Sequence, residues 1–196
     1  DGVYVGDRLD CAGDLAGVPG HYRLFENPAV ECAVLETARG AIASMGIAYD
    51  ECAVAVCLNV TPDHLDHCGI HSLEQMARLK RTVLERAVEG VVLNADDPRC
   101  LAMAPGLRAR NVCLVSMQRS LGELRASHAH CDHFALLEHA DGEEWVVLYD
   151  QGRRIPVMQV ERIPASCDGL ARHNVSNALH AIAAGYLGGI AVAAMR

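Results

Sequence analysis

Three clusters of polar side chains follow short apolar runs, and their residue types suit the chemistry of a charged ligand. The clusters are Glu36 to Gly40, Asn59 to Asp66 and Asn94 to Pro98. Carboxylate and amide oxygens bind hard cations such as Mg²⁺. Each cluster also has a structural interpretation, because Asp and Asn cap helices and form turns and a lone histidine is often a hydrogen-bonded structural residue.

A single lysine, Lys80, stands in a chain that has 17 Lys and Arg residues in total. Lysine can lose its proton and act as a nucleophile, whereas arginine stays protonated. Lys80 lies at i+4 from Met76 in a predicted helix, so it borders the apolar face of that helix. The structural alternative is a lysine that keeps its ammonium group in water.

Two groups of His and Cys residues are weaker candidates for metal ligands. The first is the segment from His128 to His133, followed by His139, and the second comprises His67, Cys68 and His71. Both fall in segments interpreted as loops or a surface hairpin, where histidines accumulate without a function. We therefore favour structural roles over a transition-metal site.

The elements that must position these residues follow an alternating order of strand and helix. A helix is predicted from Ser72 to Ala87, with apolar residues at helical spacing and Ser72 as N-cap. The predicted strands are apolar almost throughout, as strands buried on both faces are, which favours a mostly parallel α/β sheet flanked by helices. They are Val30–Leu35, Ala53–Leu58, Val91–Leu93 and Val112–Val115.

A small antiparallel meander is predicted near residues 133–160. Phe134–Leu137 and Trp145–Tyr149 flank Asp141-Gly142, a hairpin turn signal, and Arg154–Val157 is a third strand. A helix is predicted from Asn174 to Leu187. In parallel sheets ligands bind beyond the carboxyl ends of the strands, so the three polar clusters are expected along one edge.

The bulk composition is that of one soluble globular domain. The chain has 196 residues, of which 51% are hydrophobic, and its net charge of −8 argues against nucleic acid and anionic membranes as partners. None of the nine cysteines forms a C-x-x-C motif, and several lie in apolar runs, among them Cys32, Cys52, Cys57 and Cys113. We expect buried, reduced thiols and a cytoplasmic location.

Five motifs in chain order together resemble the central domain of Mur ligases and folylpolyglutamate synthetases. They are Asn59–Asp66, Lys80, Val92–Asp97, the adenine-side string His173–Leu179, and Leu35–Gly40, which is similar to the cyanophycin synthetase branch. The resemblance implies an ATP-dependent, amide-forming ligase, in which ATP phosphorylates a carboxylate and an amine attacks the acyl phosphate.

The same resemblance implies roles for individual residues. Glu36 and His64 would be metal ligands for Mg²⁺, and Lys80 would be carbamylated and hold a second ion. Asn177, together with Asn174, would seat the adenine. For Asp97 we favour a structural role.

The sequence departs from the family pattern in three places. The family's Gly-x-x-Gly-Lys-Thr/Ser phosphate loop is absent, since no Gly-Lys pair occurs, and it is expected just before Asp1. The carboxy-terminal lobe that supplies the amine substrate is expected after Arg196. Ala41 replaces the second glycine of the usual Arg-Gly-Gly-Ile. Residues 1–196 are thus interpreted as a partial central domain that is inactive alone.

The leading hypothesis is a cyanophycin synthetase-like ligase that joins arginine to the β-carboxylate of aspartate. The alternatives are a peptidoglycan-precursor, folate or poly-glutamate ligase, and a non-catalytic nucleotide-binding scaffold. The expected partner is an amino-acid or peptide substrate, and a homo-oligomer is possible. The sequence leaves the exact substrates and the polymer direction open.

Overall fold

The computed structural model describes residues 1–62 and 68–196. The chain divides into two compact units, each described here by itself. The first comprises Asp1–Asp50 with Pro62–Val83, and the second comprises Glu51–Thr61 with Leu84–Arg196.

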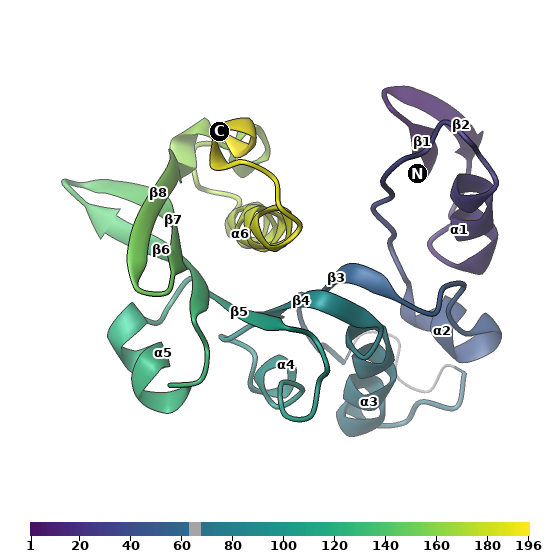
Figure 1. Cartoon of the computed structure of the whole chain (residues 1–196), viewed down its shortest axis with the longest axis horizontal. Helices are drawn as coiled ribbons and strands as arrows, with labels where there is room; N and C mark the ends of the chain where they lie inside the picture. The colour runs from purple at the N-terminus through teal and green to yellow at the C-terminus, as the bar shows by residue number, and fades with distance from the viewer. Residues whose placement is uncertain (63–67) are drawn as a thin grey trace. The chain divides into compact units, whose positions relative to one another are not determined.

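The second unit is built on a six-stranded sheet whose spatial order follows the chain (Figure 1). The first four strands pair in parallel, and the last three pair as an antiparallel meander within the same sheet. This confirms the predicted α/β class and the meander. The strands are β3 (Cys52–Cys57), β4 (Ala87–Asn94), β5 (Asn111–Ser116), β6 (His133–Ala140), β7 (Glu143–Asp150) and β8 (Arg153–Gln159).

Two tight turns connect the strands of the meander. Asp141 and Gly142 have φ angles of 54° and 84°, and Gln151 and Gly152 have φ angles of 48° and 89°. Two consecutive residues with positive φ define a type I′ turn, whose twist matches that of paired strands. The hairpin predicted at Asp141-Gly142 is confirmed.

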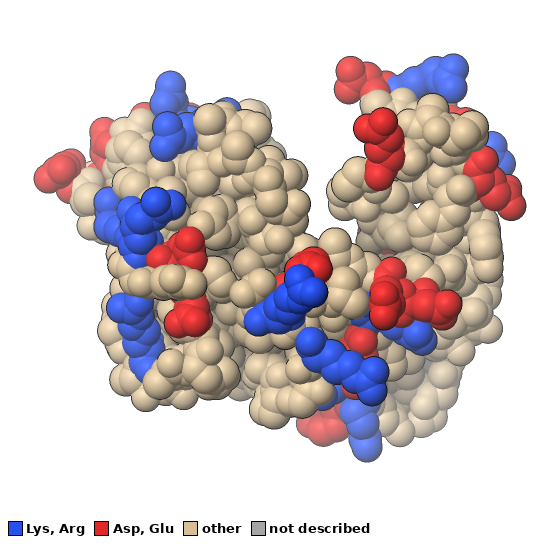
Figure 2. All heavy atoms as spheres, viewed as in Figure 1, with Lys and Arg blue, Asp and Glu red and all other residues tan. Residues whose placement is uncertain are grey.

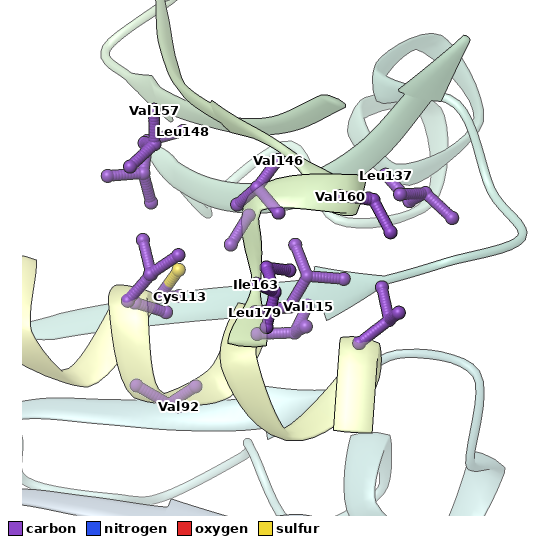
Figure 3. Close-up of a cluster of buried hydrophobic side chains, with 14 residues drawn as sticks. Val92, Cys113, Val115, Leu137, Val146, Leu148, Val157, Val160, Ile163 and Leu179 are labelled. Carbon is purple, nitrogen blue, oxygen red and sulfur yellow. The ribbon is translucent and has the colours of Figure 1, made fainter. Parts of the chain in front are cut away.

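Helices cover both faces of this sheet. Figure 1 shows α6 (Arg172–Leu187) on one face and α4 (Pro98–Leu101) and α5 (Leu121–Ser127) on the other. Short 3₁₀ helices lie at Val160–Arg162, Pro164–Ser166 and Val192–Met195. The main core packs the buried face of α6 against the strands, and Figure 3 shows Leu179 of α6 among strand side chains of this cluster. The predicted helix at Asn174–Leu187 is confirmed and begins two residues earlier.

Among its described residues, the first unit contains a hairpin and three helices. The hairpin pairs β1 (Gly2–Val5) with β2 (Arg8–Ala12) and was not predicted from the sequence. The helices are α1 (Val18–Phe25), α2 (Arg39–Met45) and α3 (Leu73–Leu84), whose last residue belongs to the second unit.

Ser72 caps α3, as predicted. Ser72 Oγ accepts a hydrogen bond from Gln75 N at 3.2 Å, and Gln75 Oε1 accepts one from Ser72 N at 3.2 Å, which is a reciprocal cap. The predicted C-terminus at Ala87 is wrong. The helix ends at Leu84 because Ala87 already pairs with Cys52 as the first residue of β4.

The strand predicted at Val30–Leu35 is also wrong. The segment has no strand assignment, and the side chain of Val34 is 96% exposed. Strands are stable when a neighbouring strand pairs with their backbone groups. Within the described part of the chain, neither sheet has a strand that pairs with this segment.

All nine cysteines lie in described residues and are free thiols. Cys57 and Cys113 are buried as expected, but Cys52 is only half-buried, and Cys32 is exposed because its segment is not part of a sheet. Across the described residues, no helix is both long and apolar enough to cross a membrane.

Candidate functional site

The turn after β4 ties the carboxyl ends of three neighbouring strands together. Asn94 Nδ2 donates to Leu58 O, beyond the end of β3, at 2.8 Å. Asp96 accepts from Ser116 Oγ at 2.5 Å and from Met117 N at 2.7 Å, at the end of β5. We call residues 94–97 the strand-end clasp, since they hold the exits of β3, β4 and β5 at fixed positions.

Asp97 completes the strand-end clasp with both carboxylate oxygens. Its Oδ1 accepts from Arg99 N at 2.8 Å and Cys100 N at 3.4 Å, which caps α4, and its Oδ2 accepts from Val60 N at 2.6 Å. The structural role predicted for Asp97 is confirmed. Its bond to Val60 also fixes the backbone four positions before the predicted ligand His64 in the sequence.

The structure describes two of the three predicted metal ligands. Glu36 is exposed and Lys80 on α3 is half-buried, as expected for a lysine at the border of an apolar face. His64 lies outside the described residues. Within the described ranges, no three His, Cys, Asp or Glu side chains come together as a metal site. The ligand set therefore stays a prediction.

Glu36 lines a cavity of about 900 Å³ in the first unit. Its backbone oxygen accepts a hydrogen bond from Nε2 of the buried His21 at 2.8 Å, which fixes the chain just before α2. Among the described side chains and backbone groups, none donates to the Glu36 carboxylate. Its oxygens are thus available to a cation, unlike those of Asp96 and Asp97.

The predicted adenine-side residues lie in the first turns of α6. Asn174 Nδ2 donates to Ala165 O at 2.7 Å, which holds its amide group, and Asn177 is exposed. The helix start is fixed by Arg172, whose guanidinium makes two hydrogen bonds to the Glu144 carboxylate at 2.6 and 3.1 Å.

The end of α6 packs closely on the sheet. Leu187 lies against Gly90 in the middle of β4, so closely that a Cβ on Gly90 would meet its side chain at 2.6 Å. A side chain at position 90 would therefore displace the helix from the strand.

His180 is a buried residue that the sequence analysis did not identify. Its side chain is 2% exposed, and its Nδ1 lies 2.7 Å from Ser176 O. Burial lowers the pKa of His180, and the hydrogen bond to Ser176 O and, to a lesser extent, the charge of Asp96 partly oppose that shift. A lone histidine in an Ala-rich helix carries no sequence signal that separates it from an ordinary core residue.

The side chains of the histidine-rich segment have separate partners in the structure. His133 interacts with Asp150 and Asn111, each at 3.3 Å, while the rings of His128 and His130 are 6.3 Å apart. His139 pairs with Glu144 at 3.0 Å. Of the second group, Cys68 and His71 are exposed, and His67 lies outside the described residues.

Acidic and basic side chains are interspersed on the face shown in Figure 2. The second unit contains defined ion pairs. Arg154 lies 2.8 Å from Glu138, and Tyr149 Oη donates to the same carboxylate at 2.5 Å. These interactions connect the strands of the meander and give the Glu138 carboxylate two partners.

Comparison with known proteins places the chain in a family. The Mur ligase middle domain matches residues 12–185. Cyanophycin synthetases from Crocosphaera subtropica and Nostoc sp. are 35% and 36% identical over 100% of this chain, and the chain covers 22% and 21% of their lengths. A UDP-N-acetylmuramoylalanine–D-glutamate ligase from Symbiobacterium thermophilum is 32% identical over 73% of this chain and 28% of its own. The chain spans about a fifth of the length of the two cyanophycin synthetases, and it belongs to the Mur ligase family through its middle domain.

Proposed function

We propose that this chain is the nucleotide-handling part of an ATP-dependent amide ligase that joins arginine to the β-carboxylate of aspartate through an acyl phosphate. The observation that supports the proposal is the higher identity to cyanophycin synthetases, 35% and 36% over 100% of the chain, whereas two muramoyl ligases are 32% and 30% identical over 73% and 96% of it. The partner is then an amino-acid or peptide substrate.

The residues present fit a magnesium site on chemical grounds. Glu36 offers an exposed carboxylate at a cavity, with oxygens that no group in the described chain engages. Mg²⁺ prefers oxygen ligands, and when bound it would neutralise phosphate charge. Glu36 and His64 would hold the ion, and a carbamylated Lys80 would add two further oxygens. The half-buried position of Lys80 suits a group that faces a site.

The first turns of α6 fit the nucleotide base. The amide nitrogen of Asn174 donates to the preceding loop, and Asn177 is exposed one turn later. An amide side chain can donate and accept at once, as the edge of an adenine requires. We propose that Asn177 contacts the base and that Asn174 fixes the start of the helix.

Phosphate binding in P-loop proteins depends on backbone N–H groups and a lysine of a Gly-Lys-Thr/Ser loop. These 196 residues contain no Gly-Lys pair. We therefore propose that the segment alone is inactive and that the full-length parent protein carries the activity.

The test is substrate-dependent ADP release by the full-length parent protein. Arginine with an aspartate-containing acceptor should stimulate release, while D-glutamate with a muramoyl-alanine acceptor, or glutamate with a folate, should not. Stimulation by one of the latter pairs would assign the parent to another branch of the family. ATP binding without release for any pair would favour a non-catalytic nucleotide-binding scaffold.

A further inference from the structure

Two buried thiols are in contact beside the strand-end clasp. Cys57 is the last residue of β3 and Cys100 lies in α4, and their sulfur atoms are 3.5 Å apart. The two residues are 5% and 0% exposed. Because the single thiol hydrogen of Cys57 is donated to Asn59 O at 3.9 Å, the hydrogen between the two sulfurs comes from Cys100. The lone pairs of the Cys57 sulfur therefore face Cys100.

The sulfur contact joins the same two elements that Asp97 joins. Asp97 caps α4 through Cys100 N at 3.4 Å and accepts from Val60 N, three residues after Cys57, at 2.6 Å. Asn94 Nδ2 donates to the carbonyl oxygen of the residue after Cys57 at 2.8 Å. These bonds fix the backbone near both cysteines, so the two sulfurs are held facing each other.

A bond between the two sulfurs would change the chain beyond β3. A disulfide is about 2.05 Å long, so the sulfurs must approach by about 1.5 Å. The disulfide has no hydrogen to donate, and the bond from Cys57 to Asn59 O is lost. The movement therefore acts on residues 59–61, which precede the predicted metal ligand His64 in the sequence.

We propose that Cys57 and Cys100 are a redox pair, whose reversible disulfide links β3 to α4 and lowers the activity of the parent protein. Formation of the disulfide is independent of the proposed function. The loss of activity rests on that function, because it assumes that His64 holds a metal ion for the reaction.

The oxidant is hydrogen peroxide, and the reaction balances in two steps. The Cys57 sulfur, the more exposed of the two, attacks one peroxide oxygen; the O–O bond breaks, and a sulfenic acid and one water form. The Cys100 sulfur then attacks the sulfenic sulfur, and the displaced hydroxide leaves as a second water with the Cys100 proton. The two thiols lose two electrons and two protons, and the peroxide is reduced to water.

The surroundings of the redox pair make this reaction slow. The contact with Cys57, together with burial, raises the pKa of the Cys100 thiol. The thiolate is the reactive form of cysteine, and a thiol in apolar surroundings stays protonated. We therefore expect the pair to react at least about tenfold more slowly than the exposed thiols of Cys32 and Cys167. Mildly alkaline buffer should accelerate the reaction.

The experiment maps disulfides in the full-length parent protein. Exposed thiols are first blocked with iodoacetamide under native conditions, and the protein is then incubated with hydrogen peroxide in mildly alkaline buffer. After denaturation, the remaining thiols are alkylated with an isotopically heavy reagent and the peptides are analysed by mass spectrometry without reductant. We expect a linked peptide that contains Cys57 and Cys100, is lighter by two hydrogen atoms than the reduced pair, and disappears after treatment with dithiothreitol.

ADP release by the same samples measures the effect on activity. Oxidation should slow it about tenfold or more, the scale of a displacement of about 1 Å near a reacting group, and dithiothreitol should restore it. Cys100→Ala and Cys57→Ala should each release ADP at nearly the untreated rate before and after peroxide. Cys113→Ala is the matched control, since it removes another buried thiol of the second unit and should stay as sensitive to peroxide as the wild type.

The two readouts separate this inference from the proposed function. Absence of the linked peptide, or an equal loss of ADP release in Cys100→Ala and wild type, would overturn the redox pair. An unchanged rate of ADP release after the linked peptide has formed would overturn its effect on activity and leave the ligase proposal intact. If the untreated parent releases no ADP with any substrate pair, the ligase proposal fails, while peptide mapping still decides whether the disulfide forms.

Discussion

Asp97 allows the most direct test of the strand-end clasp, because its two carboxylate oxygens accept hydrogen bonds from different donors. One oxygen caps α4 through Arg99 N and Cys100 N, and the other accepts from Val60 N. Asp97→Ala removes both functions. Asp97→Asn keeps one accepting oxygen and replaces the other with an amide nitrogen, which cannot accept. Whichever way the amide turns, either the cap or the bond to Val60 is lost.

The magnitudes follow from what each function stabilises. Replacing an N-cap aspartate with alanine costs about 1 kcal/mol of folding free energy. Val60 is only 5% exposed, so its N–H would be left without a partner and would cost about 2 kcal/mol. We therefore expect Asp97→Ala to destabilise the chain by about 3 kcal/mol. Asp97→Asn should cost about 2 kcal/mol if its oxygen keeps the cap, where Asn serves as well as Asp.

The single tryptophan provides the assay. Trp145 lies in β7, in the same unit as the strand-end clasp, so its fluorescence in a urea titration reports the unfolding of that unit. Glu161→Ala is the control, because Glu161 is an exposed carboxylate on a 3₁₀ helix of the same unit. It should change stability by less than about 0.5 kcal/mol. Wild-type stability in Asp97→Ala, or equal losses in Asp97→Ala and the control, would refute the strand-end clasp as a stabilising element.

Four further predictions concern the site. In the full-length parent, Glu36→Gln or His64→Ala should cut turnover by about two orders of magnitude with little change in melting temperature; a large melting shift with retained activity would make them structural. Lys80→Arg should abolish activity although it keeps the charge, and acetate or formate should partly rescue Lys80→Ala, whereas full turnover by Lys80→Arg in carbonate-free buffer would exclude a carbamate. Calorimetry on the isolated 196-residue chain should show very weak ATP binding, and micromolar affinity would indicate another phosphate site. Because burial lowers the pKa of His180, while the hydrogen bond to Ser176 O and, to a lesser extent, Asp96 partly oppose that shift, stability should fall as the pH drops below about 6.5, and urea titrations of His180→Phe should show a smaller loss.

The sequence predicted the second unit well because its signals are local and agree with one another. The apolar runs at the centre of β4 and at the end of β5 are buried on both faces of the sheet, whereas β3 is only partly buried. The Asp141-Gly142 turn has the backbone geometry that its residue types favour. Here local propensity and tertiary contacts point to the same structure.

The first unit was predicted less well, for a different reason. Val30–Leu35 has the composition of a buried strand, but its conformation depends on whether a neighbouring strand pairs with it. The hairpin β1–β2 was missed because its strands are short and β2 is mostly exposed, so they lack the apolar run that predicts a buried strand. His180 was missed because one histidine in an Ala-rich helix gives no sign in the sequence that its side chain is buried.

The sequence does not distinguish the carboxylates of Glu36, Asp96 and Asp97, but their surroundings in the folded chain differ. Asp96 and Asp97 each accept from backbone N–H groups, so their negative charge is already stabilised within the protein. Glu36 has no such donor in the described structure, and its carboxylate faces solvent at a cavity. A carboxylate whose lone pairs are filled by backbone donors holds the chain in place, whereas one left open can bind a cation. The hydrogen bonds that they accept therefore distinguish Asp96 and Asp97, which have structural roles, from Glu36, the candidate metal ligand.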